Sequence, residues 1–161
     1  MAKLSKQMKE DFEEFLVELT LLLEDLQGLL AHSKHYRDVH LGYDDKTLDR
    51  VEAFYLDVLA GKEKIDVTQA RLNRIFIAYA GEAVIARAES GRAQWALNPV
   101  AKDPSFGTPV IIDWAKDDGM AISPVERREL LIENRKPFLR ELVNYCASKQ
   151  QIERDFFKEF E

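Results

Sequence analysis

The chain has 161 residues, which is the size of one ordinary domain. Hydrophobic residues make up 46% and charged residues 32%, a balance that is typical of globular rather than disordered proteins. The formal net charge of −6 argues against binding to nucleic acid phosphates and would suit a basic partner. We therefore expect a single domain over residues 1–161 that does not bind nucleic acid.

The sequence shows no feature that directs it to a membrane or to an oxidising compartment. The single cysteine, Cys146, cannot form an intramolecular disulfide. The segment Met1-Ala2-Lys3-Leu4 leads directly into charged helical sequence, without the basic and then apolar stretch of a secretory leader. The longest apolar stretch falls well short of the ~20 residues that a membrane-spanning helix needs. We expect a cytoplasmic location and no membrane association.

The first predicted element is a long amphipathic helix over about residues 4–32. Its apolar residues recur at intervals of three and four, and three further leucines widen the stripe: Leu4, Met8, Phe12, Phe15, Leu19, Leu22, Leu26 and Leu29, with Leu16, Leu23 and Leu30. Four acidic residues are expected on the opposite side: Glu10, Glu14, Glu18 and Asp25. The wide stripe favours packing against several neighbouring helices, although the length of the helix also permits a homodimer.

Two further helices are predicted after a polar segment at about residues 32–43. Asp44 or Asp45 can cap the second helix. Asp66 with Gln69 is typical of a capping box at the start of the third. The buried face of the second helix is expected to hold Leu48, Val51, Phe54 or Tyr55, Val58 and Leu59.

The third predicted helix, about residues 67–90, is the most informative element. Residues 75–86 are apolar on every side except at Gly81 and Glu82. A helix that is apolar all round must be surrounded by other elements, so we expect this one at the centre of the fold. Glycine costs about 1 kcal/mol relative to alanine in a helix interior. Gly81 therefore indicates the close approach of another backbone.

Short apolar and β-branched segments predict two strands after this helix, at about residues 93–97 and 108–114. Their connection is too long for a tight hairpin. A short helix is expected from Ser123 to about Asn134, and Pro137 starts a last one. The inner face of the last helix is predicted to hold Leu139, Leu142, Val143, Cys146 and Ile152, and the aromatic end is expected to dock on the body through Phe156, Phe157 and Phe160.

These elements together predict an α+β fold that is mainly α. About five helices surround the central helix at residues 67–90, and a two-stranded or slightly larger antiparallel sheet follows that helix. Neither an internal repeat nor a low-complexity segment divides the chain.

His32, His35 and His40, with Asp38 between them, are the only residues whose types suggest a metal site. His32 and His35 are one helical turn apart, as ligand pairs often are. The spacing to His40 matches no specific motif, and the segment is polar. We therefore predict solvated histidines, no metal and no other cofactor.

Glu82 is the residue for which two interpretations stay open. Its helical neighbours at three and four positions include no cation, so a partner must come from another part of the fold. Structural pairing is favoured, with a tryptophan N–H or with one of three arginines: Arg127, Arg128 and Arg135. The alternative is a buried functional carboxylate in an enzyme or a ligand-binding protein. General acid–base chemistry needs a second group, which the sequence does not reveal.

Known catalytic motifs are absent, because the sequence has no nucleophile elbow and no phosphate-binding glycine loop. We therefore expect a protein that is not an enzyme. The acidic side of the first helix is a candidate surface for a basic protein partner, with two aspartates nearby: Glu10, Glu14, Glu18 and Asp25, with Asp44 and Asp45. The alternative is an ordinary solvated helix face.

The segment Tyr79-Ala80-Gly81-Glu82, followed by Gly91, Trp95 and the strand at residues 109–112, resembles small uncharacterised bacterial domains. In those domains a buried helix with a Gly-Glu step precedes a G-x-x-x-W strand, and some relatives are immunity-like proteins encoded beside secreted toxins. The resemblance covers about residues 70–115 and assigns no catalytic residue. It implies a non-catalytic binding or accessory protein, such as an immunity-type toxin inhibitor. A ligand-binding protein or enzyme that uses Glu82, and a self-associating module, are the alternatives.

Overall fold

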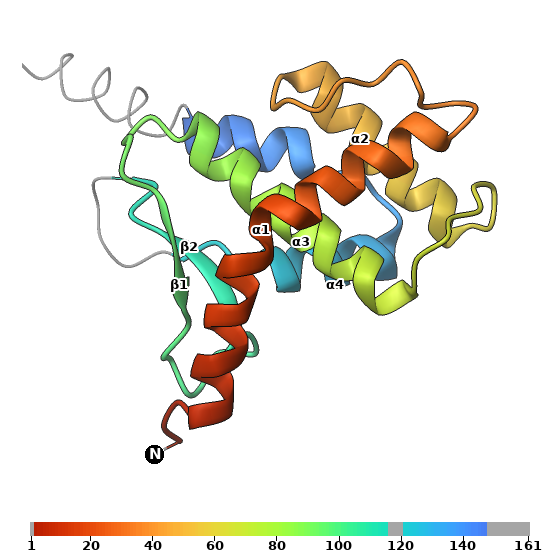
Figure 1. Cartoon of the computed structure of the whole chain (residues 1–161). Helices are drawn as coiled ribbons and strands as arrows, with labels where there is room; N and C mark the ends of the chain where they lie inside the picture. The colour runs from red at the N-terminus through yellow and green to blue at the C-terminus, as the bar shows by residue number, and fades with distance from the viewer. Residues whose placement is uncertain (1, 116–120, 148–161) are drawn as a thin grey trace, which may run out of the picture.

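The computed structural model describes residues 2–115 and 121–147. Their elements in chain order are α1 (Lys6–His32), α2 (Asp45–Leu59), α3 (Gln69–Arg87), β1 (Gln94–Leu97), β2 (Pro109–Ile112) and α4 (Pro124–Asn134) (Figure 1). A fifth helix begins at residue 139 and extends to 147, where the described range ends. The predicted α+β, mainly α class is confirmed, whereas Ile152, Phe156, Phe157 and Phe160 lie outside the described residues.

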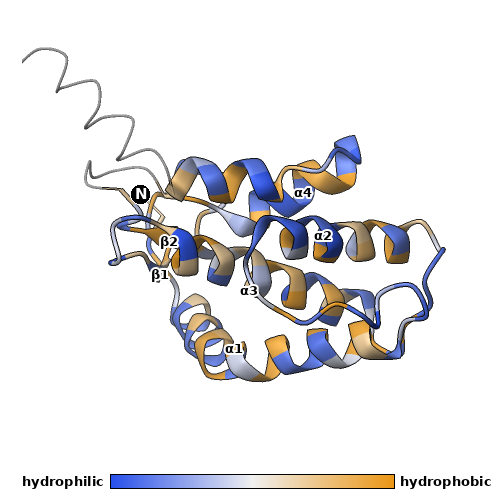
Figure 2. Ribbon diagram, turned by 90° about the horizontal axis from the view of Figure 1, so that it is seen from above, coloured by the Kyte–Doolittle hydropathy of each residue, from blue (hydrophilic) through white to orange (hydrophobic). Residues whose placement is uncertain are grey.

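The central position of α3 is also confirmed. In the view from above, α3 lies between α1 and α4 (Figure 2). Nine of its residues are buried: Leu72, Ile75, Phe76, Ala78, Tyr79, Ala80, Gly81, Ala83 and Val84. The helix ends at Arg87, before the predicted end at about residue 90, and it also begins later than predicted, because Thr68 rather than Asp66 caps it. The Thr68 hydroxyl accepts a hydrogen bond from the Arg71 N–H at 3.1 Å, which fixes the start of the helix two residues later than the predicted box.

α1 begins after Ser5, whose hydroxyl accepts a hydrogen bond from the Met8 N–H at 3.1 Å. The helix bends about midway, so that its first half runs beside the hairpin of β1 and β2 and its second half crosses α3 (Figure 1). Four residues of the predicted stripe are buried, namely Phe15, Leu22, Leu26 and Leu30. The bend allows one helix to cover both the sheet and the helical part of the core.

β1 and β2 pair antiparallel, with Trp95 opposite Ile111. The connecting loop is organised by polar groups, since the Asn98 side chain is 2% exposed and donates to the Ser105 hydroxyl at 2.9 Å. A bridge from Ile111 to Ile122 on its other side extends the sheet slightly. This matches the predicted sheet of two strands or slightly more.

Gly81 accommodates a side chain, not the backbone that its position in the sequence suggested. The indole of Trp95 lies directly on Gly81, where a Cβ atom would overlap the ring. Phe15 of α1 contacts the same indole edge-on, with 5.0 Å between the ring centroids. Trp95 therefore joins the central helix, the sheet and the first half of α1.

Candidate functional site

Two of the predicted partner-binding carboxylates, Glu18 and Asp25, join α1 to α3. The Arg71 guanidinium donates to Asp25 at 2.7 Å and lies 3.5 Å from Glu18. Arg74 lies 3.4 Å from the same Glu18 oxygen. Both carboxylates are partly buried and already face cations within the chain. They hold the helix in place and are less available to a partner than the sequence alone suggested.

Asp44 and Asp45 also have internal partners. Asp44 caps α2 by accepting the Thr47 N–H at 2.8 Å, and this hydrogen bond lowers the pKa of Asp44. Asp45 accepts from Arg87 at 2.8 Å and from Asn144 at 3.1 Å, and these bonds lower its pKa. The second aspartate thus links α2 to the C-terminal end of α3 and to the fifth helix.

Glu10 and Glu14 are the two predicted residues that are both exposed and on the outer side of α1. Glu10 lies 3.7 Å from the Lys6 ammonium, one turn earlier. An exposed pair of this kind contributes little to stability. The six acidic residues that the sequence grouped together therefore do not form one surface.

Glu82 is partly exposed, not fully buried as its apolar surroundings predicted. The Trp95 indole N–H donates to its carboxylate at 3.0 Å. This is one of the partners that the sequence proposed, whereas within the described residues none of the three predicted arginines forms an ion pair with Glu82: Arg127, Arg128 and Arg135. The bond holds the indole over Gly81, which is a structural task.

A different carboxylate, Glu52, is the deeply buried one, with 1% of its surface exposed. It accepts hydrogen bonds from the N–H groups of Phe138 and Leu139 at 3.1 and 3.0 Å, and it thereby caps the fifth helix. Burial raises the pKa of Glu52. Its place was visible in the sequence, because Glu52 lies four residues after Leu48 and three before Tyr55 on the apolar face of α2.

The three histidines do not come together at a metal site. All three are exposed, and the His32 ring lies 2.7 Å from the Gly28 carbonyl oxygen. Asp38 accepts from Arg50 at 2.8 Å. Across residues 2–115 and 121–147, no group of three or more potential ligand side chains is placed to hold a metal ion.

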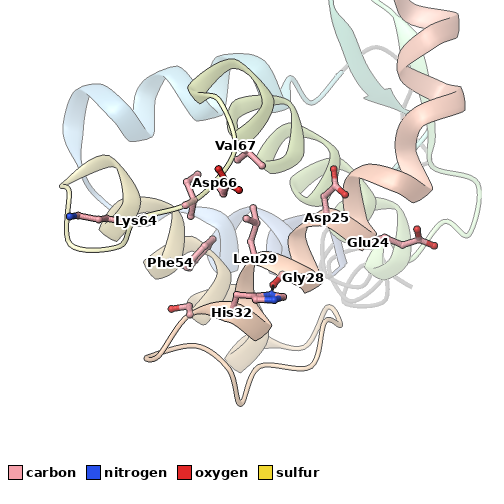
Figure 3. Close-up of a pocket in the computed structure, with 11 residues that line it drawn as sticks. Glu24, Asp25, Gly28, Leu29, His32, Phe54, Lys64, Asp66 and Val67 are labelled. Atoms are coloured by element: carbon pink, nitrogen blue, oxygen red, sulfur yellow. Dashed lines mark hydrogen bonds between the residues drawn. The ribbon is translucent and has the colours of Figure 1, made fainter.

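The site that the structure reveals is an open cleft of about 480 Å³ between the second half of α1 and the loop that leads from α2 to α3 (Figure 3). Its apolar floor is formed by four residues: Leu29, Phe54, Ile65 and Val67. The remaining lining residues are Glu24, Asp25, Gly28, His32, Ser33, Lys64 and Asp66. Two of these, Asp25 and His32, belong to groups that the sequence singled out as candidate binding or metal residues, and no other lining residue was predicted to belong to a site.

The polar lining of the cleft carries more negative than positive charge. The lining includes three carboxylates, Glu24, Asp25 and Asp66, and one lysine, and the Lys64 side chain points away from the middle of the cleft (Figure 3). Glu24 and Asp66 are exposed and have no ion-pair partner in the part of the chain that the structure describes. The cleft therefore attracts cations and leaves two carboxylates to receive one.

Ser33 borders this cleft, but its hydroxyl oxygen is buried. The residue is 6% exposed, and its hydroxyl has no hydrogen-bond partner among the described residues. A buried polar atom without a partner costs free energy, but this oxygen has no accessible surface at which a ligand could bind it. The exposed carboxylates and the apolar lining together suit a long aliphatic side chain that ends in an ammonium or a guanidinium.

Comparison of the chain with protein-family models, with curated protein sequences and with solved structures gave no significant match. Within the described ranges, no helix has the length and apolar character needed to cross a membrane. The chemistry of the cleft is therefore the firmest basis for assigning a function.

Proposed function

We propose that this chain is a non-catalytic binding protein, and that it receives a lysine or arginine side chain of a basic protein partner in the cleft beside α1. The observation that carries the proposal is a pair of exposed carboxylates, Glu24 and Asp66, which have no ion-pair partner among the described residues and lie beside apolar lining residues. Such a side chain would lay its methylene groups on the partly exposed Leu29, Ile65 and Val67 and direct its charge to the carboxylates.

The net charge of the chain supports the same kind of partner. A charge of −6 speeds the capture of a basic protein by long-range attraction. A charged hydrogen bond contributes about 1.5–3 kcal/mol, so a single anchored side chain would dominate a small interface.

An immunity-type inhibitor of a bacterial toxin is one form that this activity can take, since it would cover a basic active site with an acidic surface. The residues that carry the sequence resemblance, Gly81, Glu82 and Trp95, pack on one another. They belong to the scaffold and not to the cleft. A family with this scaffold would be free to vary its binding surface from one partner to the next.

The alternative that places an active or ligand-binding site at Glu82 has less support. Glu82 is bonded to Trp95 and does not line the cleft beside α1. In the Glu82→Gln variant the amide oxygen can still accept from the indole. We therefore expect this substitution to leave partner binding unchanged.

An NMR titration tests the proposal without knowledge of the partner. The probe is N-acetyl-arginine amide, and its control is the citrulline analogue, which has nearly the same shape and no charge. We expect the arginine compound alone to shift the amide signals of residues 24–33 and 64–67. The double variant Glu24→Gln, Asp66→Asn should lose this response, whereas Glu10→Gln should keep it. Equal shifts from both compounds, or shifts spread over the whole acidic surface, would refute the proposal.

A further inference from the structure

The outer side of α1 exposes apolar residues that the fold does not cover. Val17 is 84% exposed, Leu21 is 50% exposed and Leu16 is 38% exposed. Val17 and Leu21 are one turn apart and lie on the side of α1 opposite Leu22 and Leu26, which are buried. The sequence placed Leu16 in the inner stripe and made no use of the other two. Apolar residues that gather on one exposed helix face mark a surface for interaction.

Glutamates surround this apolar pair on the same face. Glu10, Glu14, Val17, Leu21 and Glu24 follow one another at intervals of four, three, four and three residues, which places them along one line of the helix. Glu13 lies beside this line, and all four glutamates are exposed. We call these six residues the outer face of α1. Its centre is apolar and both of its ends are acidic.

We propose that the outer face of α1 docks an amphipathic basic helix of the protein partner. Two apolar side chains of that helix would cover Val17 and Leu21, and flanking lysines or arginines would reach Glu14 and Glu24. The inference rests on the proposed function for the basic character of the partner, and it adds the shape of the segment that binds. Glu24 lies at the edge of the cleft and its side chain points away from the cleft (Figure 3), so it belongs to both surfaces.

Charge distinguishes this occupant from a second copy of the chain. If two outer faces met in parallel, Glu14 would oppose Glu14; if they met antiparallel around Val17 and Leu21, Glu14 would oppose Glu24. Both arrangements bring like charges together over the apolar centre, which weakens association. A helix with lysine or arginine at those positions turns the same contacts into ion pairs.

The experiment uses synthetic peptides and the full chain. One peptide carries leucines at alternating three- and four-residue spacing with lysines elsewhere, and the other has the same composition with the leucines spread around the helix. Fluorescence anisotropy at about 0.15 M salt, where surface charges are well screened, measures both affinities. We expect the amphipathic peptide to bind more tightly. Val17→Asp and Leu21→Asp should each weaken it by about tenfold. Val100→Asp alters a valine that is 55% exposed outside α1 and should have no effect.

The possible results separate this inference from the proposed function. If Val17→Asp loses peptide binding and Asp66→Asn retains it, the outer face is supported as the docking surface. This holds even if the NMR titration shows no arginine binding in the cleft. Loss of peptide binding in Asp66→Asn alone refutes the outer face as the docking surface and remains consistent with binding in the cleft. Equal affinity of the two peptides would show that charge attraction alone drives binding, and it would also refute docking on the outer face. A dimer seen by light scattering and abolished by Val17→Asp would assign the face to a second copy. Circular dichroism confirms that each variant is folded.

Discussion

The substitution Gly81→Ala tests how tightly the sheet is held against the central helix. Alanine is favoured over glycine in a helix interior by about 1 kcal/mol, so a helix considered alone would be stabilised. Here the new methyl group would overlap the indole of Trp95. The indole cannot shift freely, because Phe15 contacts its ring and Glu82 accepts its N–H at 3.0 Å.

The opposing contributions give the expected size of the effect. Overpacking costs about 1–3 kcal/mol, and weakening the bond between the indole and the carboxylate adds about 1 kcal/mol. After the gain in helix propensity is subtracted, we expect Gly81→Ala to lower the free energy of unfolding by about 2 kcal/mol. With a urea dependence of about 2 kcal/mol per molar, the denaturation midpoint should fall by about 1 M.

A matched control is available in the same chain. A Cβ at Gly28 of α1 would meet no atom within 4 Å, so Gly28→Ala should be neutral or stabilising. Replacing Trp95 with the smaller phenylalanine should reduce the cost of Gly81→Ala, and a double-mutant cycle measures that coupling. If Gly81→Ala were as stable as the unmodified chain, the indole would be free to move and the reasoning would be wrong.

Three further predictions concern charged groups. Replacing Glu52 with alanine should destabilise the fold by about 2 kcal/mol in urea denaturation, because two N–H groups lose their acceptor. Burial raises the pKa of Glu52, so the contribution of Glu52 to the free energy of unfolding is largest below about pH 4.3 and falls as the pH rises through the raised pKa. A difference in stability between the unmodified chain and Glu52→Gln that does not change with pH would contradict this. The Thr47 N–H lowers the pKa of Asp44, so the melting temperature advantage over Asp44→Ala should be present above about pH 4 and disappear as the pH falls through the lowered pKa. Arg71→Met should cost at most about 1 kcal/mol, because its ion pair with Asp25 is partly exposed, and less in about 1 M salt; an unchanged cost in salt would indicate lost packing instead.

Much of the fold follows from signals that lie close together in the sequence. The stripe of α1, the all-round apolar character of α3 and the β-branched residues of β2 are local patterns, and each predicted an element that the structure contains. The exact start of α3 was harder to predict. Asp66 and Thr68 are both good capping residues, and only Thr68 lies where the helix begins.

The candidate site depends on contacts that no local pattern carries. The sequence shows Glu18 and Asp25 on a polar helix side, but it does not show that Arg71 lies opposite, 46 residues after Asp25. The cleft needs the loop around Asp66 to lie beside the second half of α1, and that loop has no periodicity to predict its position. The outer face could have been predicted from the sequence, because Val17 interrupts the acidic side of α1 at a regular spacing.

The cap at Glu52 also constrains the order in which the chain can complete its structure during synthesis. Its N–H donors, Phe138 and Leu139, are 86 and 87 residues further along the chain. While those residues are still inside the ribosome, the Glu52 carboxylate lacks these N–H donors and must remain hydrogen-bonded to water. The Glu52 carboxylate therefore stays hydrated until the fifth helix emerges, and that helix then closes the core around a group made far earlier.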